Sequence, residues 1–343
     1  MPRRNADMAM QFLSDNAATV HPAIWRALQA ADHPDAPYDE DALSRRLDDA
    51  FSGVFGRECS VLWVASGTAA NCLALATMTP PHGGIVCHRD AHIETNECGA
   101  PGFYTHGAKL MLLGGEGAKV PADALAAFLS RLDRDDVHHV QPYAVSITQA
   151  TELGRVYTPG EVAVIGALAK GSGLRFHIDG ARFANAVAFL DCAPAAISCD
   201  AGADALSFGC VKNGGLGAEA IVFFDPALAD VARYRRKRAG HLQSKGRFLA
   251  AQLLAMLEGG LWLENARRAN EAAQVIAEGG RGRLQQPVES NQLFLTLDDA
   301  ERAALRAQGF GFYDWGEGGA RIVTAWDSRT EDCAKLARAI ASL

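Results

Sequence analysis

Short apolar runs alternate with helical patterns between residues 60 and 224 of this 343-residue chain. The runs have the length of buried strands, and the segments between them place apolar side chains at helical spacing. Strands and helices that alternate in this way form βαβ units, in which a mostly parallel sheet is covered by helices on both faces. The sequence therefore predicts an α/β fold. The expected strands are 60–65, 85–88, 109–113, 143–149, 174–179, 203–209 and 219–224, and the expected helices are 39–55, 121–132 and 160–173.

The remainder of the chain predicts a second, smaller domain. Helical patterns at 245–260 and from residue 262 precede short strands, in NQLFLTL and ARIVTAW, that alternate with further helices. We interpret this part as a C-terminal α+β domain. The short link between the last two strands of the large sheet favours one antiparallel neighbour. The predicted division is an N-terminal arm at 1–15, a large domain at 16–245 and a small domain at 246–343.

Charge and composition exclude several kinds of partner. The formal net charge of −7 and the pI of about 5.8 argue against nucleic acid, because proteins that bind it usually carry a basic surplus. No apolar run approaches the length of about 18 residues that spans a membrane, and the start lacks the apolar segment of a secretion signal. The eight cysteines form no CxxC pair, which favours reduced thiols, a cytoplasmic location and no metal site.

Three stretches bring chemically useful groups to the carboxyl ends of expected strands, where such sheets bind ligands. SGTAAN (66–71) opens a helix, and its small residues let backbone N–H groups approach an anion, although most such junctions are only tight turns. HIDGAR holds Asp179 and Arg182 at a strand end, either as a site for a charged ligand or as a structural ion pair. In SFGCVKNGG, Lys212 either extends to solvent or acts as an amine nucleophile of lowered pKa.

A phosphate site, a carboxylate and an amine at one sheet edge match the needs of pyridoxal phosphate. The amine would bind the aldehyde of the cofactor, and the acid would keep its ring nitrogen protonated. A dinucleotide-binding dehydrogenase is disfavoured, because no GxGxxG motif follows the first strand. The sequence therefore predicts an enzyme with pyridoxal 5'-phosphate as cofactor and a small-molecule amino acid as substrate.

The order of these stretches, with 33 residues from Asp179 to Lys212, resembles that of fold-type I pyridoxal-phosphate enzymes. From about residue 12 to 327 the chain is similar to the L-threonine aldolases, especially the low-specificity bacterial branch. The resemblance implies a fold-type I, transferase-like fold with a mostly parallel seven-stranded sheet between helices. It also implies retro-aldol cleavage of threonine, allo-threonine and related amino acids to glycine and an aldehyde, with a phenylserine aldolase or a β-eliminating amino-acid lyase as alternatives. The similar stretches are FLSDNAATVHPAIWRAL, SGTAAN, DAHIETNECGAP, HIDGARFANA, SFGCVKNG and ARIVTAWD.

The resemblance also implies roles for individual residues. Lys212 would bind the cofactor as a Schiff base, Asp179 would pair with the ring nitrogen, and His92 would stack on the ring and act as a base. The cofactor phosphate would be bound by Ser66, Gly67 and Thr68, and the substrate carboxylate by Ser14, Arg182 and Arg321, with Arg182 also near the cofactor. The protein would be a homo-oligomer, a dimer or tetramer, with the site at the subunit interface. There, Lys237 of the basic run 233–238 would meet the neighbouring subunit's cofactor.

Several of these residues have simpler interpretations that the sequence leaves open. His92 is compatible with a polar loop position, Ser14 with a turn or helix start, and Arg321 with a surface ion pair. Tyr38 fits core packing as well as an active-site role in substrate binding. Glu97 is compatible with an acid on the surface of a helix or loop.

Two positions depart from the family pattern. Val211 precedes Lys212 where family members commonly have threonine, so a hydroxyl near the cofactor is lost. Many relatives carry a histidine in the loop after the strand that resembles SITQ, and here Thr151 stands at about that place. Because that histidine is tied to handling of the β-hydroxyl group, its replacement bears on which substrates are accepted.

Overall fold

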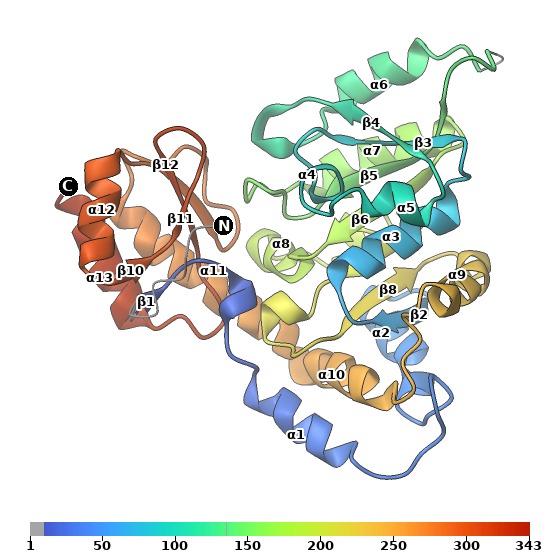
Figure 1. Ribbon diagram of the computed structural model, residues 1–343, viewed down its shortest axis with the longest axis horizontal. Helices are drawn as coiled ribbons and strands as arrows, with labels where there is room; N and C mark the ends of the chain where they lie inside the picture. Colours follow the sequence, from blue (N-terminus) through green and yellow to red (C-terminus); the bar gives the residue numbers. More distant parts are fainter. Residues whose placement is uncertain (1–9, 135) are drawn as a thin grey trace.

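The computed structural model describes residues 10–134 and 136–343, and its centre is a seven-stranded sheet (Figure 1). The strand order is β2-β8-β7-β6-β5-β3-β4, with β8 antiparallel to both of its neighbours and the other adjacent pairs parallel. The predicted α/β fold with a mostly parallel seven-stranded sheet is therefore confirmed. The strands are β1 (Met10–Gln11), β2 (Ser60–Val64), β3 (Gly83–His88), β4 (Lys109–Leu113), β5 (Gln141–Thr148), β6 (Arg175–Gly180), β7 (Ala205–Phe208), β8 (Glu219–Phe223), β9 (Gln292–Thr296), β10 (Phe310–Gly311), β11 (Tyr313–Asp314) and β12 (Gly319–Val323).

Helices follow most strands of the sheet, as the alternating pattern predicts. They are α1 (Pro22–Ala30), α2 (Leu47–Phe55), α3 (Gly67–Met78), α4 (His92–Thr95), α5 (Ala100–Tyr104), α6 (Ala122–Ser130), α7 (Pro159–Gly171), α8 (Phe183–Leu190), α9 (Pro226–Arg238), α10 (Arg247–Leu257), α11 (Leu261–Gly279), α12 (Asp299–Ala307) and α13 (Thr330–Ala341). Short 3-10 helices occur at Asp15–Ala17, Ser44–Arg46, Glu116–Ala118, Pro194–Ile197, Val211–Asn213 and Glu258–Gly260. In the described part of the chain, no helix is both long enough and apolar enough to cross a membrane.

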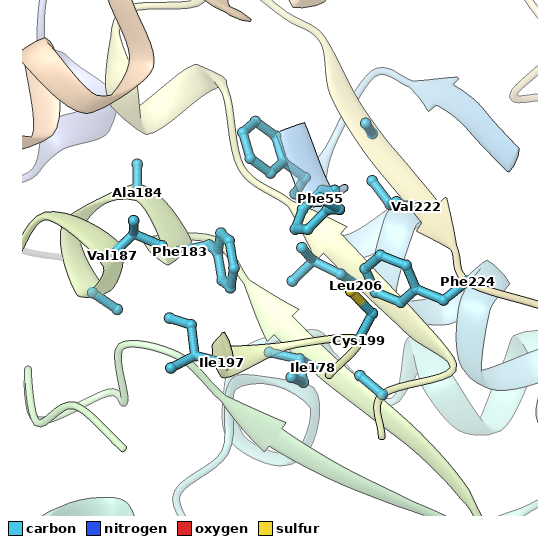
Figure 2. Packing of buried hydrophobic residues seen from close by; sticks show 14 of the residues in the cluster. Phe55, Ile178, Phe183, Ala184, Val187, Ile197, Cys199, Leu206, Val222 and Phe224 are labelled. Carbon is cyan, nitrogen blue, oxygen red and sulfur yellow. The ribbon is translucent and has the colours of Figure 1, made fainter. Parts of the chain in front are cut away.

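Alternate side chains of the strands enter two separate apolar layers. In β8, Val222 packs in the layer that contains α2, α7, α8 and α10, whereas Ile221 and Phe223 pack in the layer that contains α3 and α9. This two-sided burial is what a parallel sheet covered by helices requires. Figure 2 shows the first layer, where Phe55 of α2 and Phe183 of α8 lie against Leu206 of β7.

The helix α7 shows how local sequence sets the bounds of an element. The side chain of Thr158 accepts a hydrogen bond from the Glu161 backbone N–H, and the Glu161 carboxylate accepts one from the Thr158 N–H at 2.7 Å. This reciprocal pair satisfies two N–H groups that a helix start leaves free. Gly173, just past the end of the helix, has a φ of 69°, which a side chain would make unfavourable. The predicted helix at 160–173 is thus confirmed within two residues.

The predicted helix at 39–55 is partly wrong. The α-helix α2 begins only at Leu47, after a 3-10 turn. The buried carboxylate of Asp41 accepts hydrogen bonds from the backbone N–H groups of Leu43 and Ser44, at 3.0 and 2.8 Å. An acid that bonds the next turn in this way favours a separate cap over a continuous helix.

The C-terminal part forms a smaller unit beside the large sheet (Figure 1, orange to red). It contains the antiparallel sheet β11-β12-β9, the helices α12 and α13, and an apolar cluster that also includes Phe12 near the chain start. Residues 249–266 of α10 and α11 instead join the cluster of the large sheet, and the change occurs within α11, between Ala266 and Ala272. The division at residue 245 stays a prediction.

Candidate active site

A cavity of about 260 Å³ lies at the carboxyl ends of β5 and β6, beside the first turn of α3. Its position is the one where open α/β sheets bind ligands. Seven predicted site residues line it: Lys212, Asp179, His92, Ser66, Gly67, Thr68 and Arg182. Its other lining residues are Asn16, Ala65, Asn71, Glu97, Thr148, Ala150, Thr151, Glu152, Ala181, Val211 and Glu219. The amine, the carboxylate and the helix start that the sequence singled out therefore meet in one place.

Lys212 sits on a tight 3-10 turn between β7 and β8. Two hydrogen bonds fix this turn: the Cys210 N–H donates to Glu219 at 2.6 Å, and the Asn213 side chain donates to a backbone carbonyl at 2.8 Å. Gly214 closes the turn with a φ of 103°, a conformation that L side chains rarely adopt.

The surroundings of Lys212 favour its neutral amine. Burial lowers its pKa, and the nearby Arg182 guanidinium lowers it further, whereas Asp15, Asp179 and Glu219 act in the opposite direction. A lowered pKa leaves more of the amine unprotonated near neutral pH, as a nucleophile requires.

Asp179 is a buried acid whose position is set by two hydrogen bonds. One carboxylate oxygen accepts from the Asn71 side chain at 2.8 Å, and the other accepts from the backbone N–H of Ala181 at 3.0 Å. Its side chain is almost fully buried. An acid held in this way keeps its negative charge directed at one point of the cavity.

The surface position that the sequence leaves open for Glu97 is excluded, because its side chain is fully buried. Its Oε1 accepts a hydrogen bond from Asn71 at 3.0 Å and is 2.9 Å from Nδ1 of His92. The Asn71 amide nitrogen therefore joins Glu97 and Asp179. The hydrogen bond to Glu97 raises the pKa of His92, burial lowers it, and the charge of Asp179 raises it further, so that the net shift is upward.

The carboxylates of Glu97 and Asp179 and the imidazole of His92 also have the spacing of metal ligands. One atom each from His92, Glu97 and Asp179 lie within 4.8 Å of one another. The hydrogen bonds that Asn71 donates to both acids account for this spacing without an ion. The absence of a resident metal stays a prediction.

The first turn of α3 forms an anion-binding end of the cavity. Ser66 is the N-cap, and its hydroxyl oxygen accepts a hydrogen bond from the Ala69 N–H at 3.3 Å. The following N–H groups, at Gly67 and Thr68, have no acceptor within the helix, and the helix dipole adds positive potential there. A Cβ atom built at Gly67 would contact nothing within 4 Å, so the backbone is open to a ligand.

Two guanidinium groups are close enough to the buried Asp15 to feel its charge: Arg182, which lines the cavity, and Arg321, which does not. Arg182 forms a two-point ion pair with Asp15, with Nε and Nη2 at 2.7 and 2.9 Å from the carboxylate oxygens. Arg321 donates to the neutral amide oxygen of Gln292 at 3.1 Å. Burial and the charge of Arg182 lower the pKa of Arg321 to about 10, while Asp15 raises it. Two cations with one anion leave a positive surplus that suits a carboxylate ligand.

Ser14, Tyr38, Arg321 and Lys237 do not line the cavity. Ser14 caps the first 3-10 helix and borders a separate hollow with Asp327. Tyr38 and Lys237 lie together, with the ammonium nitrogen 4.8 Å from the ring centre. Their neighbour Arg236 is fully buried and pairs with Asp39, so the basic run is not uniformly solvated.

The polar lining residues that were not among the predicted site residues include Asn71, Glu97, Glu152 and Glu219. Asn71 ends the SGTAAN stretch, and Glu152 follows the strand that ends in Thr148. Both residues therefore come shortly after a strand of the sheet, and this place in the sequence is the signal that indicates a site position for them. The expected substitute in that loop, Thr151, is fully buried, and its hydroxyl donates to the Gly117 carbonyl at 2.8 Å. The titratable side chain of the loop is therefore Glu152.

Known proteins match both the sequence and the fold. Residues 11–300 match the Beta-eliminating lyase family. The chain is 42% identical to the low specificity L-threonine aldolase of Pseudomonas sp. strain NCIMB 10558, over 96% of this chain and 97% of the relative. It is 43% identical to the low specificity L-threonine aldolase of Pseudomonas aeruginosa, over 97% and 98% of the two chains.

Solved structures agree with this assignment. A threonine aldolase from Leishmania major is 26% identical, with a TM-score of 0.90 over 97% of this chain and 99% of that chain. The serine palmitoyltransferase of Sphingomonas wittichii, at 15% identity and a TM-score of 0.72 over 97% of this chain and 86% of that chain, shares the fold. The predicted fold-type I architecture is confirmed by these neighbours. The chain belongs to the beta-eliminating lyase family and, within it, is similar to the low-specificity L-threonine aldolases.

Proposed function

We propose that this protein cleaves L-threonine, L-allo-threonine and related β-hydroxy-α-amino acids to glycine and an aldehyde, with pyridoxal 5'-phosphate as cofactor. The observation that carries the proposal is that Lys212, Asp179 and the first turn of α3 line one cavity. The names of relatives that are more than 40% identical support the same reaction.

The donor set of the cavity fits the cofactor group by group. Lys212 offers an amine of lowered pKa for an aldehyde, and Asp179 offers a fixed negative charge for a protonated ring nitrogen. The α3 N-terminus offers N–H groups for a phosphate. When bound, pyridoxal phosphate supplies a ring that accepts the electron pair released as a bond at the substrate Cα atom breaks.

Arg182 and Arg321 would bind the substrate carboxylate. The ion pair with Asp15 uses Nε and Nη2 of Arg182 and thereby fixes the plane of the guanidinium, while Nη1 takes no part in it. A substrate carboxylate bound at these guanidinium groups fixes the rotation of the substrate about Cα. This rotation decides which bond of Cα is oriented for cleavage, and in this way the binding site would select the Cα–Cβ bond. Ser14 does not line the cavity, and its contact with the same carboxylate stays a prediction.

His92 would cover the cofactor ring and hold a proton near the substrate. Its Nδ1 is engaged by Glu97, so Nε2 is the ring nitrogen that would be available to a ligand in the cavity that the residue lines. The hydrogen bond to Glu97 raises the pKa of His92 and so favours the protonated imidazole. In its neutral form, His92 would be a candidate to accept the proton of the substrate hydroxyl; in its protonated form it would donate to the substrate instead.

The protein would act as a dimer or tetramer whose sites lie at subunit interfaces. The pairing of Lys237 with the Tyr38 ring, outside the cavity of their own chain, supports a role at the site of a neighbouring copy. Both side chains are attached to segments that meet through a backbone bridge between Tyr38 and Lys245.

The test is a product analysis of purified protein supplied with pyridoxal phosphate and a panel of L- and D-β-hydroxy amino acids, including phenylserine. Glycine together with an aldehyde, from the L-isomers only, is the expected result. Ammonia together with a keto acid would instead identify a β-eliminating lyase, the alternative that the family name keeps open. Preference for phenylserine over threonine would identify a phenylserine aldolase.

A further inference from the structure

Glu152 lines the same cavity as Lys212 and His92, and the roles above do not use it. It lies in the turn that follows β5. Its Oε1 accepts two hydrogen bonds, from the His92 backbone N–H at 2.7 Å and from the Thr148 hydroxyl at 2.8 Å. Its Oε2 is buried and has no hydrogen-bond partner among residues 10–134 and 136–343. A buried carboxylate oxygen without a partner is costly and calls for an explanation.

The fold does not need this oxygen to hold the loop. The Thr151 hydroxyl donates to Gly117, the Thr151 N–H donates to the Arg155 carbonyl, and the Gln149 side chain exchanges two hydrogen bonds with the Tyr157 backbone. These contacts fix the turn on both sides of Glu152. The position of the loop therefore does not depend on a contact of Oε2 of Glu152.

The surroundings of Glu152 give it a proton affinity suited to exchange near neutral pH. Burial raises its pKa to about 7, with a further increase from the charge of Asp179, against the hydrogen bonds from Thr148 and His92. A group with such a pKa can both accept and release a proton under working conditions. The titratable or charged groups that share the cavity are His92, Glu97, Asp179, Arg182, Lys212 and Glu219.

The other acids of the cavity are already engaged. Asp179 accepts from Asn71 and Ala181, and Glu97 accepts from Asn71 beside His92. Glu219 accepts from the Cys210 N–H and holds the turn of Lys212. Among these lining acids, Glu152 is the one with a fully buried oxygen that has no hydrogen-bond partner in the described part of the chain.

We propose that Glu152 accepts the proton of the substrate β-hydroxyl group during cleavage, an inference that rests on the proposed function. The O–H bond breaks and its proton goes to Oε2, while the oxygen forms the carbonyl of the aldehyde. The Cα–Cβ bond breaks, and its electron pair stays on Cα, where the bound cofactor stabilises it. Glu152 then releases this proton to solvent, and Cα takes up one proton from solvent to give glycine, so that atoms and charge balance. The hydrogen bond from the His92 backbone N–H fixes the Glu152 carboxylate relative to the residue that carries the imidazole.

The test compares Glu152→Gln with Glu289→Gln. The amide of Glu152→Gln still accepts the hydrogen bonds from His92 and Thr148 but cannot take up a proton. Glu289 is the matched control, because it accepts from the Val156 N–H and pairs with Arg155 in the same loop without lining the cavity. Two reactions are followed: aldehyde release from L-threonine, and exchange of the glycine α-hydrogen with D₂O by NMR. The second needs the amine and the cofactor but no β-hydroxyl group.

Glu152→Gln should lower kcat/KM for L-threonine on the order of 100-fold, as expected for loss of a proton acceptor, and leave glycine exchange within about twofold. Glu289→Gln should change both by no more than about twofold. Glu152→Asp, which keeps a carboxyl group one methylene shorter, should recover part of the lost rate. A loss of glycine exchange in Glu152→Gln as large as the loss of threonine cleavage would overturn the proposal, since the residue would then support the cofactor site.

A readout independent of activity is the titration of ¹³C-labelled glutamate side chains in the cofactor-free protein. Burial raises the pKa of both Glu152 and Glu219 to about 7, so two carboxyl signals should titrate near neutrality, and Glu152→Gln should remove one. If the wild-type protein cleaves threonine and Glu152→Gln cleaves it equally fast, the inference fails while the proposed function stands. If the wild-type protein exchanges glycine but releases no aldehyde from any β-hydroxy amino acid, the proposed function itself fails.

Discussion

The guanidinium of Arg182 forms a two-point ion pair with the carboxylate of Asp15, which lies 167 residues earlier in the chain. Both side chains are buried, and Asn291 of the C-terminal part donates a further hydrogen bond to Asp15 at 2.9 Å. Burial alone would raise the pKa of Asp15, but the charges of Arg182 and Lys212 outweigh it and lower the pKa. Three distant segments are thereby joined at the edge of the cavity.

Replacement of Asp15 by Asn should destabilise the protein. Loss of one partner leaves the Arg182 charge buried without compensation, which costs about 3 kcal/mol in the free energy of unfolding. The measurement is urea unfolding followed by circular dichroism. The control is Glu40→Gln, which breaks the exposed pair with Arg45 and should change the free energy by less than about 1 kcal/mol. Equal losses in the two variants would contradict the assignment of Asp15 as a buried anchor.

Lys212 should be the site of covalent attachment of the cofactor. Borohydride reduction of the protein loaded with pyridoxal phosphate should add the reduced cofactor to the peptide that contains Lys212, as detected by mass spectrometry. The Lys212→Ala variant should show no addition, and Lys237→Ala should retain it. Addition at another lysine would remove the basis of the proposed reaction.

Replacement of Glu97 by Gln should lower the pKa of His92, because the charged hydrogen bond is the main cause of its upward shift. NMR titration of the His92 ring protons measures the change directly. A raised pKa in the folded state stabilises the protein fully below the unfolded value of about 6.5 and ceases to do so as pH rises through the folded value. The stability difference between wild type and Glu97→Gln should therefore be larger at pH 5 than at pH 9. A His92 titration that is identical in both proteins would refute the pairing.

A shared site predicts that two defective variants repair each other. Lys237→Ala should bind pyridoxal phosphate more weakly, by about tenfold, because a charged partner of the phosphate is lost. Mixed oligomers of Lys212→Ala and Lys237→Ala contain some sites with Lys212 from one chain and Lys237 of the partner subunit, and these sites are intact. Activity at limiting cofactor should exceed that of either variant alone after the two are unfolded and refolded together. No gain in activity would place Lys237 outside the site of the neighbouring copy.

Much of the fold and part of the site follow from patterns that are local in the sequence. Strand and helix periods depend on neighbouring residues, which is why β3 to β8 and α6 to α7 lie close to their expected ranges. Because the carboxyl ends of parallel strands meet at one edge, Asp179 and Lys212 could be assigned to one site before their contacts were known. The helix start at SGTAAN follows from the same reasoning.

Contacts through space were not predictable in this way. Nothing in the sequence near Glu97 indicates that its side chain is fully buried beside Asn71 and His92, and the sequence leaves a surface position open for it. The position of Glu152 likewise depends on the turn after β5 packing against the start of α4. Burial of a polar side chain is decided by what packs over it, and that information is distributed over the whole chain.

The sequence by itself determined the α/β class, the order of the strands along the chain and the residue types available at the sheet edge, because side-chain period and turn residues act over a few positions. Only the tertiary structure decided which acids of the cavity accept hydrogen bonds and which acid has a buried carboxylate oxygen without a partner. The pairing of Asp15 with Arg182 and the isolation of Oε2 in Glu152 arise from segments far apart in sequence. The physical reason is that hydrogen-bond partners and desolvation are properties of the packed chain and not of its local pattern.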